Sequence, residues 1–407
     1  MHKIGAVRLP RLRSGPGAAH PILAPHTVVR VTLAADTHRR RLVVAGLVGF
    51  LLLGLVAAVL GPVLPQLRAR FHLSVAQGSL LLTVYSIGSV VGVLASGWAS
   101  HLRYPRPAMV VGTAVLAGGS VGLAFAGAWW LVLVSGTLLG VGFGILDFGV
   151  SVILASSFAE SGASVLTSLS AVFSVGAVIG PVVVAATPHD VRPTFLVITA
   201  LSAILAVLWT RTPVHGPSPA EAPASRHLAT RLALGFGFLL ALYVAMESGV
   251  AAWETTYLRS ASHFTDSSAA RATSLFWVAI TVGRLTGGWV ARRVHVGLLV
   301  SSSLVMVALS LVVAGLPGLG LAGYTAAGLF LAPVFPAAFA WFSATRPSSL
   351  AMTLVFSCGV LGPAVVSPII GAGTQQLGVA AIPFTLFVVA LLDIVAVITV
   401  RRRLDPV

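Results

Sequence analysis

Long apolar runs alternate with short polar breaks along this chain. From residue 42 onward about twelve runs occur, each of roughly the 20 residues that a helix needs to cross about 30 Å of hydrocarbon. Because a bilayer offers no water, such runs must satisfy their own backbone hydrogen bonds and are expected to be helical. The expected spans are 42–66, 78–99, 108–127, 131–158, 165–187, 194–210, 231–257, 269–290, 297–315, 319–343, 350–373 and 381–400. The pattern predicts an all-α integral membrane protein with twelve transmembrane helices.

The composition excludes several classes of protein. Hydrophobic residues make up 57% of the 407 positions and charged residues 9%, which excludes a water-soluble globular domain. The formal net charge of +15 comes from arginines that lie almost entirely between apolar runs. It therefore indicates membrane topology and not a nucleic-acid partner. The single cysteine, Cys358, cannot form an internal disulfide, and no residues resemble a metal-ligand cluster.

The longest polar interruption divides the chain in two. It is the segment 211–230, rich in Pro, Ala and Ser. We expect a six-helix bundle at 42–210, a cytoplasmic linker at 211–230 and a second six-helix bundle at 231–400. Residues 1–41 carry arginines and prolines without an apolar period and are expected to be a basic, disordered cytoplasmic tail. Residues 401–407 form a short second tail.

The arginines also predict the orientation. Positively charged residues are enriched in cytoplasmic loops, and the loops differ in this chain when the N-terminus is placed inside. The inner segments then hold Arg103, Arg106, Arg211, Arg226, Arg231, Arg292, Arg293, Arg346, Arg401, Arg402 and Arg403, and the outer loops hold Arg68, Arg70, Arg192, Arg259 and Arg271. Both termini are expected in the cytoplasm of a multi-pass plasma-membrane protein.

The two halves repeat each other. Gly92, Gly97 and Trp98 at the end of the second span coincide with Gly283, Gly288 and Trp289 at the end of the eighth, at a constant offset. The segment "FSVGAVIGP" at 173–181 likewise matches "FSCGVLGP" at 356–363 with one residue deleted. Two matches in corresponding spans indicate a duplicated six-helix unit, which is typical of transporters that rock around a site near the membrane centre.

Residues 42–403 resemble the major facilitator superfamily. The segments "GWASHLR" and "GWVARRV" are similar to its cytoplasmic loop motif, which would comprise Gly97, His101 and Arg103 in the first half and Gly288, Arg292 and Arg293 in the second. His101 and Arg292 stand where the motif usually has aspartate. This resemblance implies two pseudo-symmetric bundles, with the first helix of each three-helix unit lining a central cavity.

Within the superfamily, several segments look like the fucose/glucose/galactose permease branch. They are "GFGILDFGVSVILA", "MESGVAAWETTYL", "SLFWVAITVGRLTGGW" and "GLFLAPVFPAAFA". The branch commonly has D-x-G-x-N in helix 4; Asp147 and Gly149 match, and Ser151 replaces the asparagine. The likeness implies uptake of a sugar or sugar-like solute. The chain has no asparagine, however, so a sugar site would rely on hydroxyls and carboxylates.

Drug exporters of the superfamily are the competing branch. Their helix-5 motif is half present: Gly176, Gly180 and Pro181 match, and Val184 and Ala185 replace its glycine pair. Their helix-4 arginine would fall at Gly136. Export of an amphipathic compound therefore stays an alternative to uptake.

Acidic residues inside spans are the main functional candidates, because the bilayer penalises them unless they face a cavity or a partner. Asp147 is about 16 residues into its helix, on the cytoplasmic side; Glu247 is equally deep into its own helix, toward the outer side. Burial disfavours a charged carboxylate, so such a group can take up a proton. We expect Asp147 and Glu247 to carry the coupling proton, with a static hydrogen-bonded acid as the alternative. Asp393, on a peripheral helix, fits a packing role.

A second set of residues fits substrate contact or gating. Glu254, with Trp253, Tyr257 and Arg259 beside it, is expected near the outer end of its helix, where a structural role is the alternative. Arg284 either snorkels or pairs with an acid in a gate. Pro333 and Pro336 are expected to interrupt one span near mid-membrane. The aromatic residues that follow, Phe335 and Phe339, are candidates for the pocket wall or for packing.

These observations predict a secondary transporter of a small organic solute that works by alternating access. A membrane enzyme would need a convergent nucleophile and base, and a sensor would need a sizeable output segment; neither is visible. We expect a monomer in the lipid bilayer that binds a small-molecule substrate and uses no cofactor other than the proton gradient, with sodium not excluded.

Overall fold

The structure is a computed structural model that describes residues 25–101, 104–158, 162–212, 226–291, 293–345 and 348–404. Residues Met1–Arg40 form one compact unit and Arg41–Val407 a second. In the first unit the described residues are helical from Pro25, the start of α1 (Pro25–Phe71). Residues 25–41 are thus part of a helix, and the expectation of a basic cytoplasmic tail stays a prediction. Pro25 suits the first turn of a helix because its missing N–H needs no partner there. Residues 1–24 lie outside the described part.

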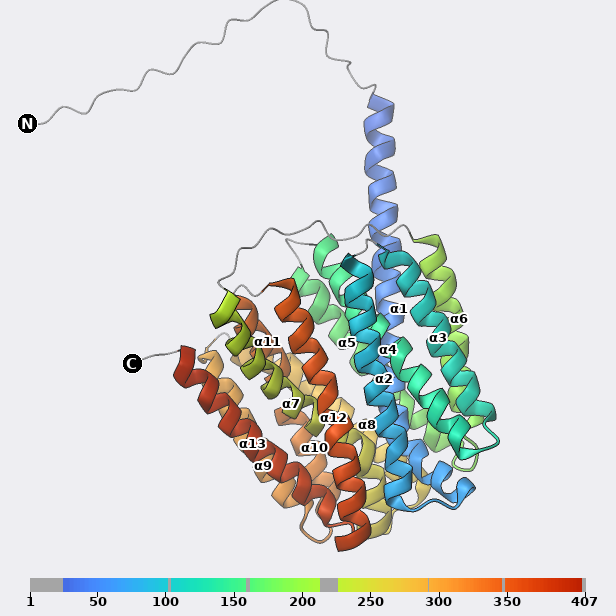
Figure 1. Cartoon of the computed structure of the whole chain (residues 1–407), viewed down its shortest axis with the longest axis vertical. Coiled ribbons are helices and arrows are strands. Elements are labelled where there is room, and N and C mark those ends of the chain that lie inside the picture. The colour runs from blue at the N-terminus through green and yellow to red at the C-terminus, as the bar shows by residue number, and fades with distance from the viewer. Residues whose placement is uncertain are drawn as a thin grey trace, which may run out of the picture. The chain divides into compact units, whose positions relative to one another are not determined.

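The second unit is a bundle of helices packed side by side (Figure 1). Its first half comprises α1, α2 (Val75–His101), α3 (Pro105–Phe125), α4 (Trp129–Ser157), α5 (Gly162–Ala186) and α6 (Arg192–Arg211). Its second half comprises α7 (Arg226–Ala261), α8 (Asp266–Val290), α9 (Val296–Ala314), α10 (Gly320–Leu331), α11 (Val334–Ala344), α12 (Ser349–Leu377) and α13 (Ala381–Leu404).

These helices match the apolar runs of the sequence. Among the described residues, eleven stretches are long and apolar enough to span a membrane. They include Gly320–Ala344, in which α10 and α11 form one span broken before Val334 by Ala332 and Pro333. Pro333 thus lies at the expected break, whereas Pro336 lies in the first turn of α11. The helix outside this set is α8, which carries Arg271, Arg284 and many hydroxyl and glycine residues. With α8 in its expected place, the order of twelve spans follows the prediction.

Matched glycines make matched close contacts in the two halves. A Cβ on Gly92 of α2 would overlap the carbonyl of Val141 on α4, and a Cβ on Gly283 of α8 would overlap the carbonyl of Leu329 on α10. In the other repeat, Gly176 of α5 abuts Leu51 of α1. Glycine permits such approach of two helix backbones in a membrane. The repeat therefore preserves the same pairs of packed helices in each half.

The second glycine repeat places α12 against α7 in the same way. Its Gly362 corresponds to Gly180, and a Cβ there would overlap the carbonyl of Ala241. The pairs α5 with α1 and α12 with α7 are thus equivalent. The duplication inferred from the sequence is visible as paired helix contacts.

The two halves meet through α2 with α12 and α5 with α8 (Figure 1). On α8, Ser267 and Ser274 lie seven residues apart and donate to the carbonyls of Ala185 and Val178 on α5, at 3.0 and 2.9 Å. On α2, the Ala76 amide donates to Gln375 at the far end of α12 at 3.3 Å. These contacts gather where α1 ends and α2 begins, which we call the predicted outer end.

We predict that Gly92→Ala destabilises the protein while Gly118→Ala does not. The added methyl at position 92 meets a helix backbone that cannot rotate away, and overpacking of this kind costs about 1–3 kcal/mol. Gly118, on α3, has open space around a built Cβ, so alanine there is neutral or stabilising. Thermal melting of the purified variants in detergent tests this, and equal melting temperatures for the two variants would contradict the close α2–α4 contact.

Candidate functional site: an ion pair that joins three helices

Arg284 of α8 and Glu247 of α7 form an ion pair inside the second half. Arg284 Nη2 lies 3.2 Å from Glu247 Oε1, and the two side chains are 19% and 14% exposed. A guanidinium and a carboxylate removed from water each lose hydration, which their mutual attraction and further hydrogen bonds must offset. Of the two alternatives, the structure has Arg284 paired with an acid and not merely extended toward the membrane surface.

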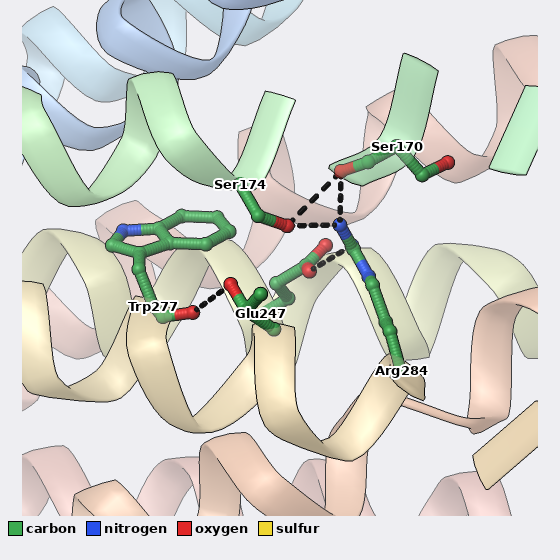
Figure 2. Close-up of polar contacts among 6 residues, drawn as sticks. Ser170, Ser174, Glu247, Trp277 and Arg284 are labelled. Atoms are coloured by element: carbon green, nitrogen blue, oxygen red, sulfur yellow. Dashed lines mark hydrogen bonds and ion pairs between the residues drawn. The ribbon is translucent and has the colours of Figure 1, made fainter. Parts of the chain in front are cut away.

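The other arm of the guanidinium reaches the first half of the protein. Arg284 Nη1 donates to Ser174 Oγ at 3.0 Å and to the Ser170 carbonyl at 3.3 Å, both on α5 (Figure 2). The Ser174 hydroxyl is fully buried and also donates to the Ser170 carbonyl at 3.0 Å. The planar guanidinium presents several donors in fixed directions, which suits one group bound on two sides. Arg284 thus connects α7, α8 and α5.

Tyr243 borders the ion pair from one helical turn earlier on α7. Its ring is buried, and its hydroxyl lies close enough to Glu247 and Arg284 to interact with both. A buried hydroxyl needs a polar partner, and the ion pair supplies it.

A series of aromatic rings runs from Tyr243 across the interface. Tyr243 contacts Phe335 of α11 at 5.7 Å between ring centroids, and Phe335 stacks on Phe339 at 5.9 Å with the rings nearly parallel. Phe339 then meets Phe356 of α12 at 5.5 Å, and Phe356 meets Phe148 of α4 at 5.7 Å, both edge to face. The predicted wall residues Phe335 and Phe339 are therefore half-buried members of a ring series that reaches both halves.

Asp147 lies apart from the ion pair. It is near the C-terminal end of α4, next to Phe148, and is half-buried. No hydrogen bond or ion pair to it is found among the described residues, and its electrostatic neighbour is Tyr85 of α2, whose buried hydroxyl also has no partner. Asp147 and Glu247 do not form one cluster.

Glu247 lies near the middle of the membrane-spanning stretch Leu232–Ala261, because α7 continues to Ala261 beyond the expected end at residue 257. Its contact with Arg284 fixes both groups at the same level. The sequence had placed Glu247 toward the outer side, and its depth in the membrane stays a prediction.

Glu254 lies one heptad further along α7 in a closed environment. Its side chain is 0% exposed, and neither carboxylate oxygen has a hydrogen bond. Arg259, expected beside it, instead pairs with Asp266 at 2.7 Å. Trp253 and Tyr257 are also buried, and Tyr257 meets Tyr324 of α10 edge to face at 5.5 Å. Glu254, Trp253 and Tyr257 are therefore enclosed by packed helices, and a gating or structural role for them stays a prediction.

The predicted cytoplasmic loop motif is only partly described. Gly97 is buried near the end of α2, and Gly288 is helical in α8. His101 ends α2, and Arg293 follows α8 with an interaction of its own. Arg103 and Arg292 lie outside the described residues, so the motif's charge network stays a prediction.

Sequence reasoning missed the residues that complete the site. Ser170 and Ser174 hold the second arm of Arg284, Tyr243 borders the pair, and Phe148 and Phe356 extend the ring series. One signal was available, because Ser174 belongs to the repeated segment 173–181. The others are ordinary serine and aromatic residues in apolar helices, which no sequence pattern sets apart.

Comparison with known proteins agrees with this architecture. The sequence profile of the Major Facilitator Superfamily matches residues 46–297. The chain belongs to this superfamily, and its long apolar helices make it a multi-pass membrane protein. An uncharacterised MFS-type transporter of Enterobacter sp. strain 638 is 27% identical over 179 residues, 43% of this chain. That match spans 47% of the relative, about half its length.

Solved structures share the fold. The xylose transporter XylE from E. coli, in a partially occluded inward-open conformation, matches with a TM-score of 0.72 at 13% identity, covering 90% of this chain and 99% of that chain. A single-residue variant of the E. coli fucose:proton symporter FucP matches with a TM-score of 0.61 at 18% identity, covering 88% of this chain and 98% of that chain. At these identities the likeness establishes the major facilitator fold.

We predict that Glu247 and Arg284 are energetically coupled. Glu247→Gln or Arg284→Gln alone leaves an unpaired charge and is expected to cost about 3–5 kcal/mol, whereas the double variant should lose less than the sum of the two. The exposed pair of Arg259 and Asp266 is the matched control, with a coupling under about 1 kcal/mol. Melting temperatures of the singles and doubles measure both cycles, and additive losses at 247 and 284 would refute the pair.

Proposed function

We propose that this protein is a proton-coupled secondary transporter that takes up a sugar-like solute by alternating access. The observation that carries the proposal is the Glu247–Arg284 pair, whose second arm binds α5 of the opposite half. A charged contact between moving halves can be switched by one proton. We also propose that the protein lies in the plasma membrane with both termini in the cytoplasm, as the arginine distribution favours.

The coupling step follows from the charges. An ionised Glu247 balances the charge of Arg284 at 3.2 Å. When a proton binds the carboxylate, the ion pair becomes a cation beside a neutral acid and loses its Coulomb attraction. Arg284 then depends on the two α5 oxygens or on a new acceptor from the substrate. Protonation therefore weakens the contact between the halves in the state that contains it. This changes the free-energy difference between the two conformations of the transport cycle.

The ring series supports a solute with a flat apolar face and hydroxyl groups. Parallel Phe335 and Phe339 offer stacking surfaces, and Tyr243, Ser174 and Glu247 offer hydrogen-bonding groups at one end of the series. Fucose and xylose, the sugars in the names of the two structural relatives, have an apolar face as well as hydroxyl groups. Asp147, half-buried without a hydrogen-bond partner among the described residues, is our candidate for a second proton carrier in the first half.

Efflux of an amphipathic compound is the second candidate. It is favoured by the density of aromatic rings around the pair together with the absence of asparagine from the whole chain. A site that binds many hydroxyls usually uses amides for double hydrogen bonds, whereas stacked rings beside one acid suit a lipophilic cation.

A ligand panel is expected to separate the two candidates. A ligand that binds only the folded protein stabilises it by about 2.7 kcal/mol at 100 times its Kd, whichever direction it travels. We predict that a pentose or hexose such as xylose or fucose raises the melting temperature of the purified protein, and that Phe339→Ala removes this increase. Stabilisation by lipophilic cations but by no sugar would overturn uptake in favour of efflux.

Proton coupling is tested in proteoliposomes with an imposed pH gradient. We predict that Glu247→Gln and Asp147→Asn each abolish uphill accumulation of the stabilising ligand and keep ligand exchange across the membrane, because exchange needs no net proton movement. Asp266→Asn, at an exposed acid outside the site, should accumulate ligand as the unchanged protein does. Undiminished uphill accumulation by both site variants would show that the proton travels elsewhere.

A further inference from the structure

A second buried acid on α7 plays no part in the ion pair. Glu254 is fully enclosed, and both of its oxygens lack hydrogen bonds. Its polar neighbours are Thr273 of α8 and Tyr324 of α10, which interact with it from two packed helices. Thr273 is engaged with Thr255 at 3.0 Å, and the Tyr324 hydroxyl is buried without a partner. The site is a closed polar pocket inside the second half.

The charges around this pocket leave the acid uncompensated. Among the described residues, no cation is found in interaction with Glu254: Arg259 pairs with Asp266, Arg284 pairs with Glu247, and Arg68 of α1 interacts with Arg259. The titratable groups near it are Tyr324 and, on its own helix, Tyr257, which are both neutral donors. A lone ionised carboxylate is strongly disfavoured in such a place.

The pocket also lacks the features of a metal site. No group of three His, Cys, Asp or Glu side chains that could hold a metal ion occurs in the described part of the chain. Thr255 and Thr273 bind each other, so no preformed shell of oxygens surrounds the carboxylate. One carboxyl with neutral hydroxyls beside it suits a single proton better than a sodium ion, which needs several oxygen ligands at once.

Glu254 lies next to the contact between the two halves. One turn before it on α7, Ala251 and Ala252 press so closely on Gly61 of α1 that a Cβ there would overlap the Ala251 carbonyl. Trp253 reaches Gly371 of α12, which also abuts Ser79 of α2. The segment 251–254 therefore belongs to the closed predicted outer end. If the halves rock apart there, the neighbours that seal the pocket move.

We propose that Glu254 is a further proton-binding site of the transport cycle, beside Glu247 and Asp147: it binds its proton while the predicted outer end is closed and can exchange that proton only when this end opens. The proposal rests on the alternating access proposed above. It is separate from the Glu247–Arg284 pair, because it involves a different acid with neutral neighbours and needs no substrate contact. The step is a simple protonation, in which the carboxylate and one proton give the neutral acid.

Infrared spectroscopy tests directly whether Glu254 carries a proton. At neutral pH we expect a carbonyl band of a protonated carboxylic acid that disappears in Glu254→Gln and persists in Glu247→Gln. Glu254→Asp is the control for folding. Because it keeps a carboxyl group at this position, it should shift the band and not remove it. Asp393, another fully buried acid, contributes its own band, which Asp393→Asn identifies. Absence of a Glu254 band, or its loss on adding sodium chloride at constant pH, overturns the proposal.

Cross-linking tests the sealing. Ala185→Cys and Ser267→Cys, at a contact of 3.0 Å between α5 and α8, are introduced in a Cys358→Ser background and joined by a short thiol cross-linker. Hydrogen exchange of the Glu254 band in heavy water should slow about tenfold or more on cross-linking, because the open state is no longer populated, while the Asp393 band keeps its rate. An unchanged Glu254 rate overturns the proposal. Neither measurement needs a substrate, so failure of the proposed transport activity would be seen separately.

Discussion

One guanidinium inside the apolar helices, that of Arg284, constrains how the two halves of the protein meet. A cation removed from water must find acceptors, and this one finds a carboxylate on α7 and two oxygens on α5. Since α5 belongs to the first half and α7 and α8 to the second, the separation of the halves here changes the surroundings of a charge. Among the hydrogen bonds between the halves described above, those of Arg284 are the ones that involve a charged side chain.

Several other contacts between the halves, among the described residues, are neutral. Ser267 and Ser274 donate to backbone carbonyls, and Gly61 lets α1 and α7 touch without a side chain between them. Neutral hydrogen bonds and glycine contacts contribute little net free energy each, so they can break and re-form at small cost. The charged contact is therefore the one through which a proton can bias a movement, while the neutral contacts determine where the halves can close.

The sequence predicted the fold well and the site only in part. Apolar runs locate helices because the bilayer fixes their length and composition, and Pro333 marked the break between α10 and α11 for the same physical reason. The partner of Arg284 could not be predicted, because pairing depends on how α7 and α8 rotate and slide against each other, and apolar periodicity is nearly uniform around such helices. Ser174 has no chemistry that sets it apart until its neighbour is known.

Glu247 and Glu254 illustrate the limit of helical periodicity. Seven residues return a helix to nearly the same face, so helical periodicity by itself does not distinguish the two acids. Seven residues also move about 10 Å along the axis, and at that distance the neighbouring helices present different groups. Glu247 meets a cation, whereas Glu254 meets threonine and tyrosine hydroxyls. The difference in their chemistry is thus set by the neighbours and not by the helix on which they lie. A proton that binds Glu247 changes an ion pair, whereas a proton that binds Glu254 removes a lone charge.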